Sequence, residues 1–369
     1  MKKNQIIQIY GTDYKNNTVV LLEEADLASH IPSKNARIAI KPNLVSPTPA
    51  SYGATTHPEV IAGIIEYLKD HDFHNLVIME SSWVGDKTED AFLVCGYQDL
   101  SDRYQVPLID LQKAESVKRD CSGMKLSICK PALDADFLIN VPVLKGHCQT
   151  RITCALKNMK GLIPNREKRR FHSMGLHKPI AHLNTEIRQD FIVIDHICGD
   201  LDFEDGGHPV VRNCIMAACD PVLTDALVCR MLHYDLEDVP YVNLAQSLGV
   251  GSADLDEADI YKIPSESDRD KKTDSLPLPK KAVLVEDAVE EVESCSACYG
   301  ALIPALSRLR EERLFDRLNE KICIGQGFRG KSGKLGVGDC TRLFNRSVPG
   351  CPPSEEDIYE SLKAFLKNV

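Results

Sequence analysis

Short apolar runs alternate with segments of helical periodicity over the first 263 residues. Near-continuous runs of this length are expected of strands that are buried on both faces. Between two of the runs, Ile61, Ile64, Ile65 and Leu68 form an apolar stripe at helical spacing. The alternation predicts an α/β fold with a mostly parallel sheet flanked by helices. The strand-like runs cover residues 37–40, 75–79, 106–110, 137–141 and 191–195.

Capping patterns mark two helix starts in this part of the chain. Thr56 precedes Glu59 by the spacing of a capping box, so Thr56 is predicted to cap a helix. Asp220 comes directly before Pro221, which favours a helix start with the aspartate as the cap. Ligands of open parallel sheets bind at the carboxyl ends of the strands, and we therefore expect a site at that edge.

A polar segment divides the chain into two predicted domains. Residues 264–281 lack periodicity and are typical of a linker, and a new strand is predicted over residues 282–285. The sequence thus predicts a first α/β domain over residues 1–263 and a smaller C-terminal α/β domain over residues 282–369. A length of 369 residues also favours more than one core.

Composition limits the classes of partner that we expect for the protein. The net charge of −10 argues against nucleic acid, because phosphate binding needs a basic face. No apolar run approaches the length that a membrane helix needs, and the N-terminus leads into a strand-like stretch rather than the apolar segment of a signal peptide. We therefore expect a cytoplasmic protein with neither a membrane nor a nucleic-acid partner.

The fourteen cysteines form two groups. Nine lie between Cys95 and Cys229, mostly singly inside apolar segments, and are interpreted as buried free thiols. The other five occur in the predicted C-terminal domain, where glycine and proline surround them. Cys295 and Cys298 form a C-x-x-C motif, which zinc sites, redox dithiols and iron–sulfur sites all use.

Two further cysteines bear on these alternatives. Cys340 follows Gly-Val-Gly-Asp, and Cys351 lies within Val-Pro-Gly-Cys-Pro-Pro, so glycine or proline shapes both turns. Glycine lets backbone N–H groups approach cluster sulfur atoms. A structural zinc site usually pairs two close C-x-x-C motifs, and a dithiol would leave Cys340 and Cys351 without a role. We favour an iron–sulfur cluster, with zinc or unligated thiols as the alternatives.

The order of these motifs, followed by an acidic helix, resembles a known cluster domain. Residues 282–369 are similar to the proximal-cluster fold that small subunits of nickel–iron hydrogenases share with the cluster-bearing subunit of respiratory complex I. Cys323 has no counterpart among the ligands of that fold and is assigned to the core, although it could substitute for one of them. The resemblance implies a four-iron four-sulfur cluster with four cysteine ligands, Cys295, Cys298, Cys340 and Cys351.

Polar residues at the predicted strand ends are the second group of candidates. Lysine and histidine at the exit of a buried strand suit an anionic or carbonyl ligand, and segment 140–172 is the richest in them. The acidic, glycine-rich segment 200–208 is interpreted as a solvated turn, with a divalent-ion loop as the alternative. The candidate catalytic residues are Lys145, His147, Lys157 and His172, and the candidate substrate- or cofactor-binding residues are Lys41, Asn43, Glu80 and Asn158.

Five segments of the first domain carry a second resemblance, namely residues 41–43, 56–59, 140–147, 155–161 and 220–221. They resemble the iron–sulfur-associated family called domain of unknown function 362. Many members of that family carry a bacterial ferredoxin insert or tail, whereas this chain has the hydrogenase-like cysteines instead. The resemblance implies a setting in anaerobic redox metabolism without naming a reaction.

These features predict an iron–sulfur redox protein, and an oxidoreductase is the first hypothesis. The cluster would pass electrons to a small anionic substrate or a second cofactor at the strand ends, where lysine and histidine stabilise negative charge and supply a proton. A non-enzymatic electron carrier or maturation partner, docked on a redox partner protein, is another hypothesis. A flavin is compatible with the sequence, but no residue pattern supports it.

A weaker resemblance adds a further hypothesis. The order and spacing of His147, Lys157 and His172 are similar to those of nickel-cofactor lactate racemases, and residues 150–155 replace the glycine-rich stretch of those enzymes. The resemblance implies acid–base, cofactor-anchoring and nickel-binding roles for the three residues in that order. The alternative function is therefore a racemase or isomerase of a small hydroxy acid, although this replacement leaves the nickel cofactor itself unsupported.

Overall fold

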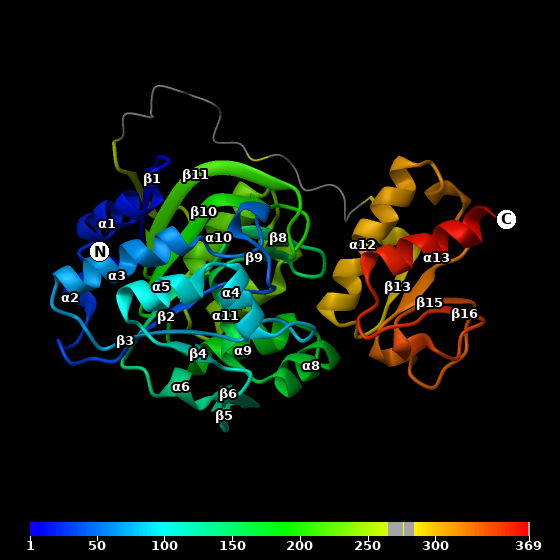
Figure 1. Cartoon of the computed structure of the whole chain (residues 1–369), viewed down its shortest axis with the longest axis horizontal. Helices are drawn as coiled ribbons and strands as arrows, with labels where there is room; N and C mark the ends of the chain where they lie inside the picture. Colours follow the sequence, from blue (N-terminus) through cyan, green and yellow to red (C-terminus); the bar gives the residue numbers. More distant parts are fainter. Residues whose placement is uncertain (265–275, 277–283, 368–369) are drawn as a thin grey trace. The chain divides into compact units, whose positions relative to one another are not determined.

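The computed structural model describes residues 1–264, 276 and 284–367. The chain forms two compact units, one made of residues 1–168 and 177–277 and the other of residues 169–176 and 278–369 (Figure 1). Apart from Pro264 and Leu276, the linker predicted over residues 264–281 lies outside the described residues. None of the described helices combines the length and the apolar surface that a bilayer crossing requires.

The first unit is built around an eight-stranded sheet. Five of its seven neighbouring pairs are parallel, and β11 runs antiparallel to both of its neighbours. The prediction of a mostly parallel sheet is therefore confirmed. In sheet order the strands are β12 (Asp259–Lys262), β1 (Gln5–Tyr10), β11 (Pro209–Ala218), β10 (Phe191–Asp200), β7 (Phe137–Val141), β2 (Ile38–Pro42), β3 (Leu76–Glu80) and β4 (Leu108–Asp110).

Each of the five predicted strand runs corresponds to a strand of this sheet. β2, β3, β7 and β10 are buried at every position, which explains why their sequences are continuously apolar rather than alternating. β10 continues beyond the predicted run to Asp200, and its polar residues Asp195 and His196 are buried. β11 was not predicted; its first half contains Arg212 and Asn213 and is incompletely buried.

The helices of the first unit form two packed groups. Helix α1 packs against α3, and α3 packs against α5. The apolar residues of these helices and of the strands form one core. Helices α7, α9, α10 and α11 contact one another in the second group. The bounds are α1 (Tyr14–Glu24), α2 (Leu27–His30), α3 (Pro58–Asp70), α4 (Thr88–Val94), α5 (Tyr97–Tyr104), α6 (Lys130–Leu133), α7 (Ala155–Asn158), α8 (Asn165–Ser173), α9 (His177–Glu186), α10 (Pro221–Met231) and α11 (Pro240–Ser247).

The two predicted caps have different outcomes. Asp220 caps α10 as predicted, because its side chain accepts hydrogen bonds from the backbone N–H groups of Val222 and Leu223. The prediction that Thr56 caps α3 is wrong: His57 is the cap residue, and no side chain caps the helix. The Thr56 hydroxyl instead donates to the Val141 carbonyl at 2.8 Å and so ties the entry of α3 to β7.

The C-terminal unit has a four-stranded parallel sheet and two longer helices. The strand predicted over residues 282–285 is wrong for its described part, because Leu284 and Val285 form a turn and the strand begins at Val289. In sheet order the strands are β13 (Val289–Glu291), β14 (Ile322–Ile324), β15 (Leu335–Val337) and β16 (Arg346–Val348). The helices are α12 (Ser296–Glu311) and α13 (Glu355–Lys367), which pack against each other.

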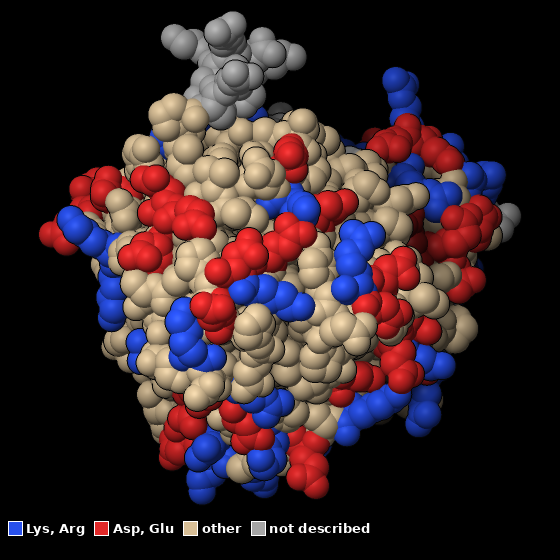
Figure 2. Space-filling view, turned by 60° about the vertical axis from the view of Figure 1, so that its left-hand side comes forward, with Lys and Arg blue, Asp and Glu red and all other residues tan. Residues whose placement is uncertain are grey.

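Charged side chains of both signs are mixed over the surface. Figure 2 shows Lys and Arg interspersed with Asp and Glu on one face of the molecule. Exposed ion pairs such as Lys113–Glu89 and Lys15–Glu66 join some of them. Pairs of this kind contribute about 1 kcal/mol or less each, so the buried groups described next matter more for the fold.

Candidate functional site

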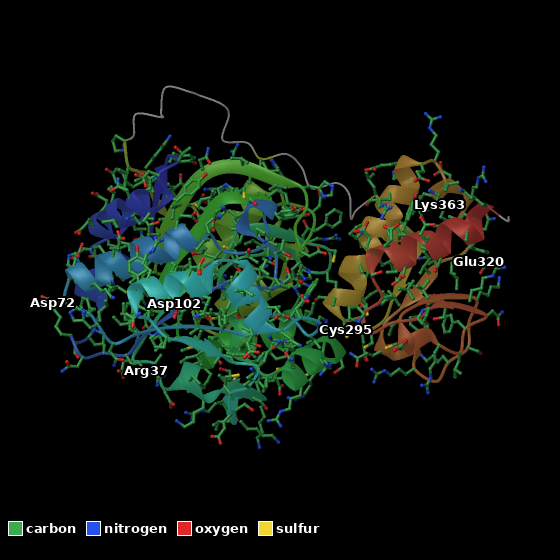
Figure 3. The ribbon with its side chains drawn as sticks, in the orientation of Figure 1. Arg37, Asp72, Asp102, Cys295, Glu320 and Lys363 are labelled. Carbon is green, nitrogen blue, oxygen red and sulfur yellow. The ribbon has the colours of Figure 1, made fainter. Side chains whose placement is uncertain are left out.

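The four predicted cysteine ligands line one cavity in the C-terminal unit. Cys295 lies at the start of α12 (Figure 3), and Cys298 lies in its first turn. Cys340 follows β15, and Cys351 follows β16. Because β13, β14, β15 and β16 are parallel, the loops after these strands leave the sheet at the same edge, and the cavity forms there.

Backbone contacts fix the turns that carry Cys340 and Cys351. The Asp339 N–H donates to the Gly350 carbonyl at 2.9 Å, and the Asp339 carboxylate accepts the Gly350 N–H at 2.8 Å. Gly338 has a φ of 87°, and a Cβ there would lie 3.8 Å from the sulfur of Cys298. The glycine therefore keeps the backbone close to the cysteine sulfur atoms without a side chain between them. No feature of the sequence had indicated this role of Asp339.

Two side chains from one short turn donate to the cysteine sulfur atoms. Arg329 Nε lies 3.4 Å from the sulfur of Cys340, and Gln326 Nε2 lies 3.9 Å from that of Cys295. Both follow β14 in a Gly-Gln-Gly-Phe-Arg-Gly segment, and no sequence feature indicated that they reach the cysteines. N–H···S contacts of this kind are the outer-shell interactions that tune cluster potentials.

Burial and the neighbouring cysteines oppose the ionisation of Cys295 and Cys298. Burial, followed by the nearby Cys295, Cys351 and Cys340, raises the pKa of Cys298 to about 12. Four thiolates at these positions would therefore need positive charge between them, of the kind that a bound metal supplies. In the described part of the chain, no three His, Cys, Asp or Glu side chains already converge on a single ion position. Cys323 lies outside the cavity lining, with its sulfur 3.7 Å from Glu290 Oε2.

In the first unit, three of the predicted catalytic residues converge on Glu204. His147 Nε2 lies 2.9 Å from Glu204 Oε2, and Lys157 donates to Glu204 Oε1. Lys145 donates to the Glu204 backbone carbonyl and to the Ala54 carbonyl, both at 2.6 Å. Lys145 and His147 lie on β8 (Lys145–His147), which forms a hairpin with β9 (Arg151–Thr153).

Glu204 corrects the interpretation of segment 200–208 as a solvated turn. Its side chain is only 13% exposed, because two cationic or polar partners hold it inside. The Asp200 carboxylate accepts the backbone N–H groups of Asp202, Phe203 and His208, and this closes the loop that turns Glu204 inward. An acidic, glycine-rich sequence suits both an exposed turn and this arrangement, so the sequence alone did not distinguish them.

Burial changes the pKa values of the residues around Glu204. It lowers the pKa of Lys145 to about 7 and that of His147 to about 4. Burial would raise the pKa of the Glu204 carboxyl, but His147 and Lys157 outweigh it and hold that pKa well below the ordinary value. His147 Nδ1 accepts the backbone N–H groups of Gln149 and Thr150, at 3.0 and 3.1 Å, so its single proton lies on Nε2 and points at Glu204.

The neutral His147 predicts a pH dependence of stability. Its pKa is about 4 in the folded protein against 6.5 unfolded, so between these values the unfolded chain binds more protons. We expect stability to fall as pH falls from about 6.5 to 4, with His147 accounting for up to about 3 kcal/mol. Denaturant unfolding of the first unit at several pH values measures this, and His147→Gln should flatten the dependence. An unchanged pH dependence in that variant would contradict the assignment.

Three of the four predicted binding residues, Lys41, Glu80 and Asn158, share a second buried network. Lys41 Nζ donates to Glu80 Oε2 and to the Pro42 carbonyl at 2.7 Å, and to Asn158 Oδ1 at 3.2 Å. Asn158 in turn donates to Asn140 Oδ1 at 2.7 Å. Asn43 is 6% exposed, and its Oδ1 has no hydrogen-bond partner among the described residues. The network continues from Asn140 to Gln189, at 2.6 Å.

His172 belongs to a different unit from the other predicted catalytic residues. It lies on α8 and is buried, but residues 169–176 belong to the C-terminal unit, whereas His147 and Lys157 belong to the first. The structure therefore brings together Lys145, His147 and Lys157, and separately Lys41, Glu80 and Asn158. The catalytic and binding roles of all these residues stay predictions.

The first unit is thus a mostly parallel α/β domain with buried polar groups at its strand ends, and the second is a small cysteine-bearing α/β domain. The chain belongs to the family described as Domain of unknown function (DUF362), whose model matches residues 38–230. This confirms the membership predicted from the sequence. The iron–sulfur association and the hydrogenase-like character of the C-terminal segment stay predictions.

Two individual proteins are similar to this chain. It is 23% identical over 221 residues to a thylakoid-associated protein of Synechocystis sp., and the match covers 58% of this chain and 68% of that protein. Among solved structures, it is similar to the lactate racemase apoprotein from Thermoanaerobacterium thermosaccharolyticum, with 18% identity and a TM-score of 0.41. That match covers 63% of this chain and 58% of the racemase chain.

Proposed function

We propose that this chain is an iron–sulfur redox protein whose C-terminal unit binds one four-iron four-sulfur cluster. The observation that carries the proposal is that four cysteines from three separate turns line a single cavity. Four cysteine thiolates are the ligand set that such clusters use. The ligands in this proposal are Cys295, Cys298, Cys340 and Cys351.

The residues around the cavity fit such a group. Arg329 and Gln326 direct N–H groups at ligand sulfur atoms and offset their negative charge. Asp339 holds two of the ligand turns together, and Gly338 leaves the space beside Cys298 without a side chain. A bound cluster would accept and release single electrons.

Protein that is purified and kept without oxygen allows a direct test of the proposed cluster. Iron and acid-labile sulfide should be present in equal amounts, and the protein should show the visible absorption of sulfide-to-iron charge transfer, bleached by a low-potential reductant. A colourless protein that contains stoichiometric zinc and no sulfide after reconstitution with iron and sulfide would contradict it.

The oxidoreductase form of the proposal assigns a substrate site to the first unit. Lys145 and Lys157 lie around the Glu204 carboxylate, and His147 directs its Nε2–H at the same group. A carboxylate or similar anion of a small substrate has the chemistry to take the place of the Glu204 side chain there. Lysine and histidine would then stabilise negative charge on the substrate and return a proton to it.

Arg329 provides a test of how the protein would tune the cluster. Arg329→Gln removes a positive charge and an N–H donor beside Cys340. We expect the variant to keep its iron and sulfide but to show a more negative midpoint potential, because the oxidised, less negative state is then favoured. Potentiometric titration, monitored by electron paramagnetic resonance, measures the midpoint potential. Arg313→Gln, an exposed arginine outside the cavity lining, is the matched control and should leave the potential unchanged.

A racemase or isomerase of a small hydroxy acid is a second candidate. The observation that favours it is that His147 and Lys157 bind the same Glu204 carboxylate, which places an acid–base group and a cation together. A single enantiomer of such an acid, incubated with the protein in heavy water, would then exchange its α-hydrogen. Full exchange by a His147→Gln variant would contradict a catalytic role for that residue.

A further inference from the structure

A thiol, an imidazole and a carboxylate lie in line in the first unit, outside both sites described above. Asp195 and Cys198 lie on β10, and His57 is the cap residue of α3. His57 Nδ1 lies 2.8 Å from Asp195 Oδ2, and His57 Nε2 lies 3.8 Å from the sulfur of Cys198. All three residues are 9% exposed or less. A nucleophile, a base and a group that orients the base are the parts of an activated thiol.

The carboxylate is held in place by the backbone. Asp195 Oδ2 also accepts the backbone N–H of His57 at 2.8 Å, and Asp195 Oδ1 accepts that of Ile197 at 3.1 Å. Burial alone would lower the pKa of His57, but the adjacent Asp195 outweighs it and raises this pKa to about 10. The ring is therefore an imidazolium at neutral pH, with its Nε2–H toward Cys198. The sulfur also lies 3.4 Å from the Ala50 carbonyl oxygen.

We propose that Cys198 is an activated thiol that hydrogen peroxide or a similarly small peroxide oxidises to a sulfenic acid. The thiolate sulfur attacks one peroxide oxygen, so that an S–O bond forms and the O–O bond breaks. The sulfur loses two electrons and the peroxide gains them. The departing hydroxide takes the Nε2 proton of His57 and leaves as water. The small size of the oxidant follows from the burial of the sulfur, since His57 and Cys198 leave little exposed surface.

Cys95 is a matched comparison within the same unit. Its exposure is 5%, the same as that of Cys198. Its sulfur faces the carbonyl of Thr48 at 3.2 Å and, at 3.8 Å, the carbonyl of Ser46 and the hydroxyl of Thr55; no imidazole is among its hydrogen-bond partners. Burial raises the pKa of Cys95. The two thiols thus differ in chemical environment rather than in access, and the imidazolium is the difference.

The test compares the two thiols in one sample of the full chain. Protein purified without oxygen receives a brief pulse of hydrogen peroxide, with a chelator present to bind any released iron, and dimedone traps sulfenic acid. Peptide mass spectrometry then gives the labelling rate of each cysteine. We expect Cys198 to be labelled at least about tenfold faster than Cys95, because only Cys198 of the two has an imidazolium beside its sulfur. Equal rates at the two cysteines would overturn the proposal without any variant.

Two variants then test the part played by His57. His57→Gln should reduce the Cys198 rate to that of Cys95 and leave Cys95 unchanged, with an unchanged circular dichroism spectrum as the check on folding. His71→Gln, at a partly exposed histidine that follows the other end of α3, should change neither rate. A folded His57→Gln protein that still oxidises Cys198 at the original rate would overturn the proposal.

Discussion

Replacing Cys351 by serine is expected to remove most of the iron, the acid-labile sulfide and the visible absorption of protein purified without oxygen. Serine keeps the size of the side chain but offers a hydroxyl in place of a soft thiolate, and iron–sulfur clusters depend on thiolates. Cys351 is exposed, so the substitution removes little packing. Loss of the cluster in a folded variant would therefore report on ligation rather than on a collapsed domain.

Cys323→Ser is the matched control for this result. Cys323 is the one other cysteine of the predicted C-terminal domain, it is partly exposed, and its sulfur contacts Glu290 rather than the cavity. The variant is expected to keep the iron, the sulfide and the absorption of the original protein. Equal loss in both variants would mean that Cys323 is a ligand or that the spectrum does not report on the cavity. Retention of the full cluster in Cys351→Ser would remove Cys351 from the ligand set.

The fold could be predicted where the environment of a strand is uniform. β2, β3 and β7 are buried on both faces, so every position selects an apolar residue and the run is visible in the sequence. β11 could not be predicted in this way, because only its second half is buried. The cap of α3 was assigned wrongly because the spacing of Thr56 and Glu59 suits a capping box, while the Thr56 hydroxyl is already bound to β7.

The candidate sites could be predicted only as far as residue type reveals them. Cysteines in glycine- and proline-rich turns are rare enough to be noticed singly, and the structure brings four of them to one cavity. Glu204 and Asp339 could not be found in this way, because acidic residues near glycine are ordinary in exposed turns. Their partners lie far away in sequence or across a turn, and only the folded chain brings His147 and Lys157 to Glu204.

Replacing Lys41 by methionine is expected to destabilise the first unit by about 3–5 kcal/mol, because it leaves the buried Glu80 carboxylate without its counter-charge. Lys41 is fully buried, and its Nζ lies 2.7 Å from Glu80 Oε2. The backbone N–H groups of Leu44 and Ser81 still donate to Glu80 in the variant, but they carry no net charge. Denaturant unfolding of the first unit measures the loss. The exposed pair Lys113–Glu89 is the matched control, and Lys113→Met should cost about 1 kcal/mol or less.

A second substitution separates a structural role of Lys41 from the binding role predicted from the sequence. In Lys41→Met/Glu80→Gln the uncompensated charge is gone. The backbone N–H groups of Leu44 and Ser81 bind different oxygens of the Glu80 carboxylate, so the amide oxygen can accept one of them, and part of the lost stability should return. A double variant no more stable than Lys41→Met would contradict the charge argument. Lys41→Met could instead remain as stable as the original protein and lose only the binding of a small anion. In that case Lys41 binds the ligand, and its contact with Glu80 positions the lysine side chain for that binding.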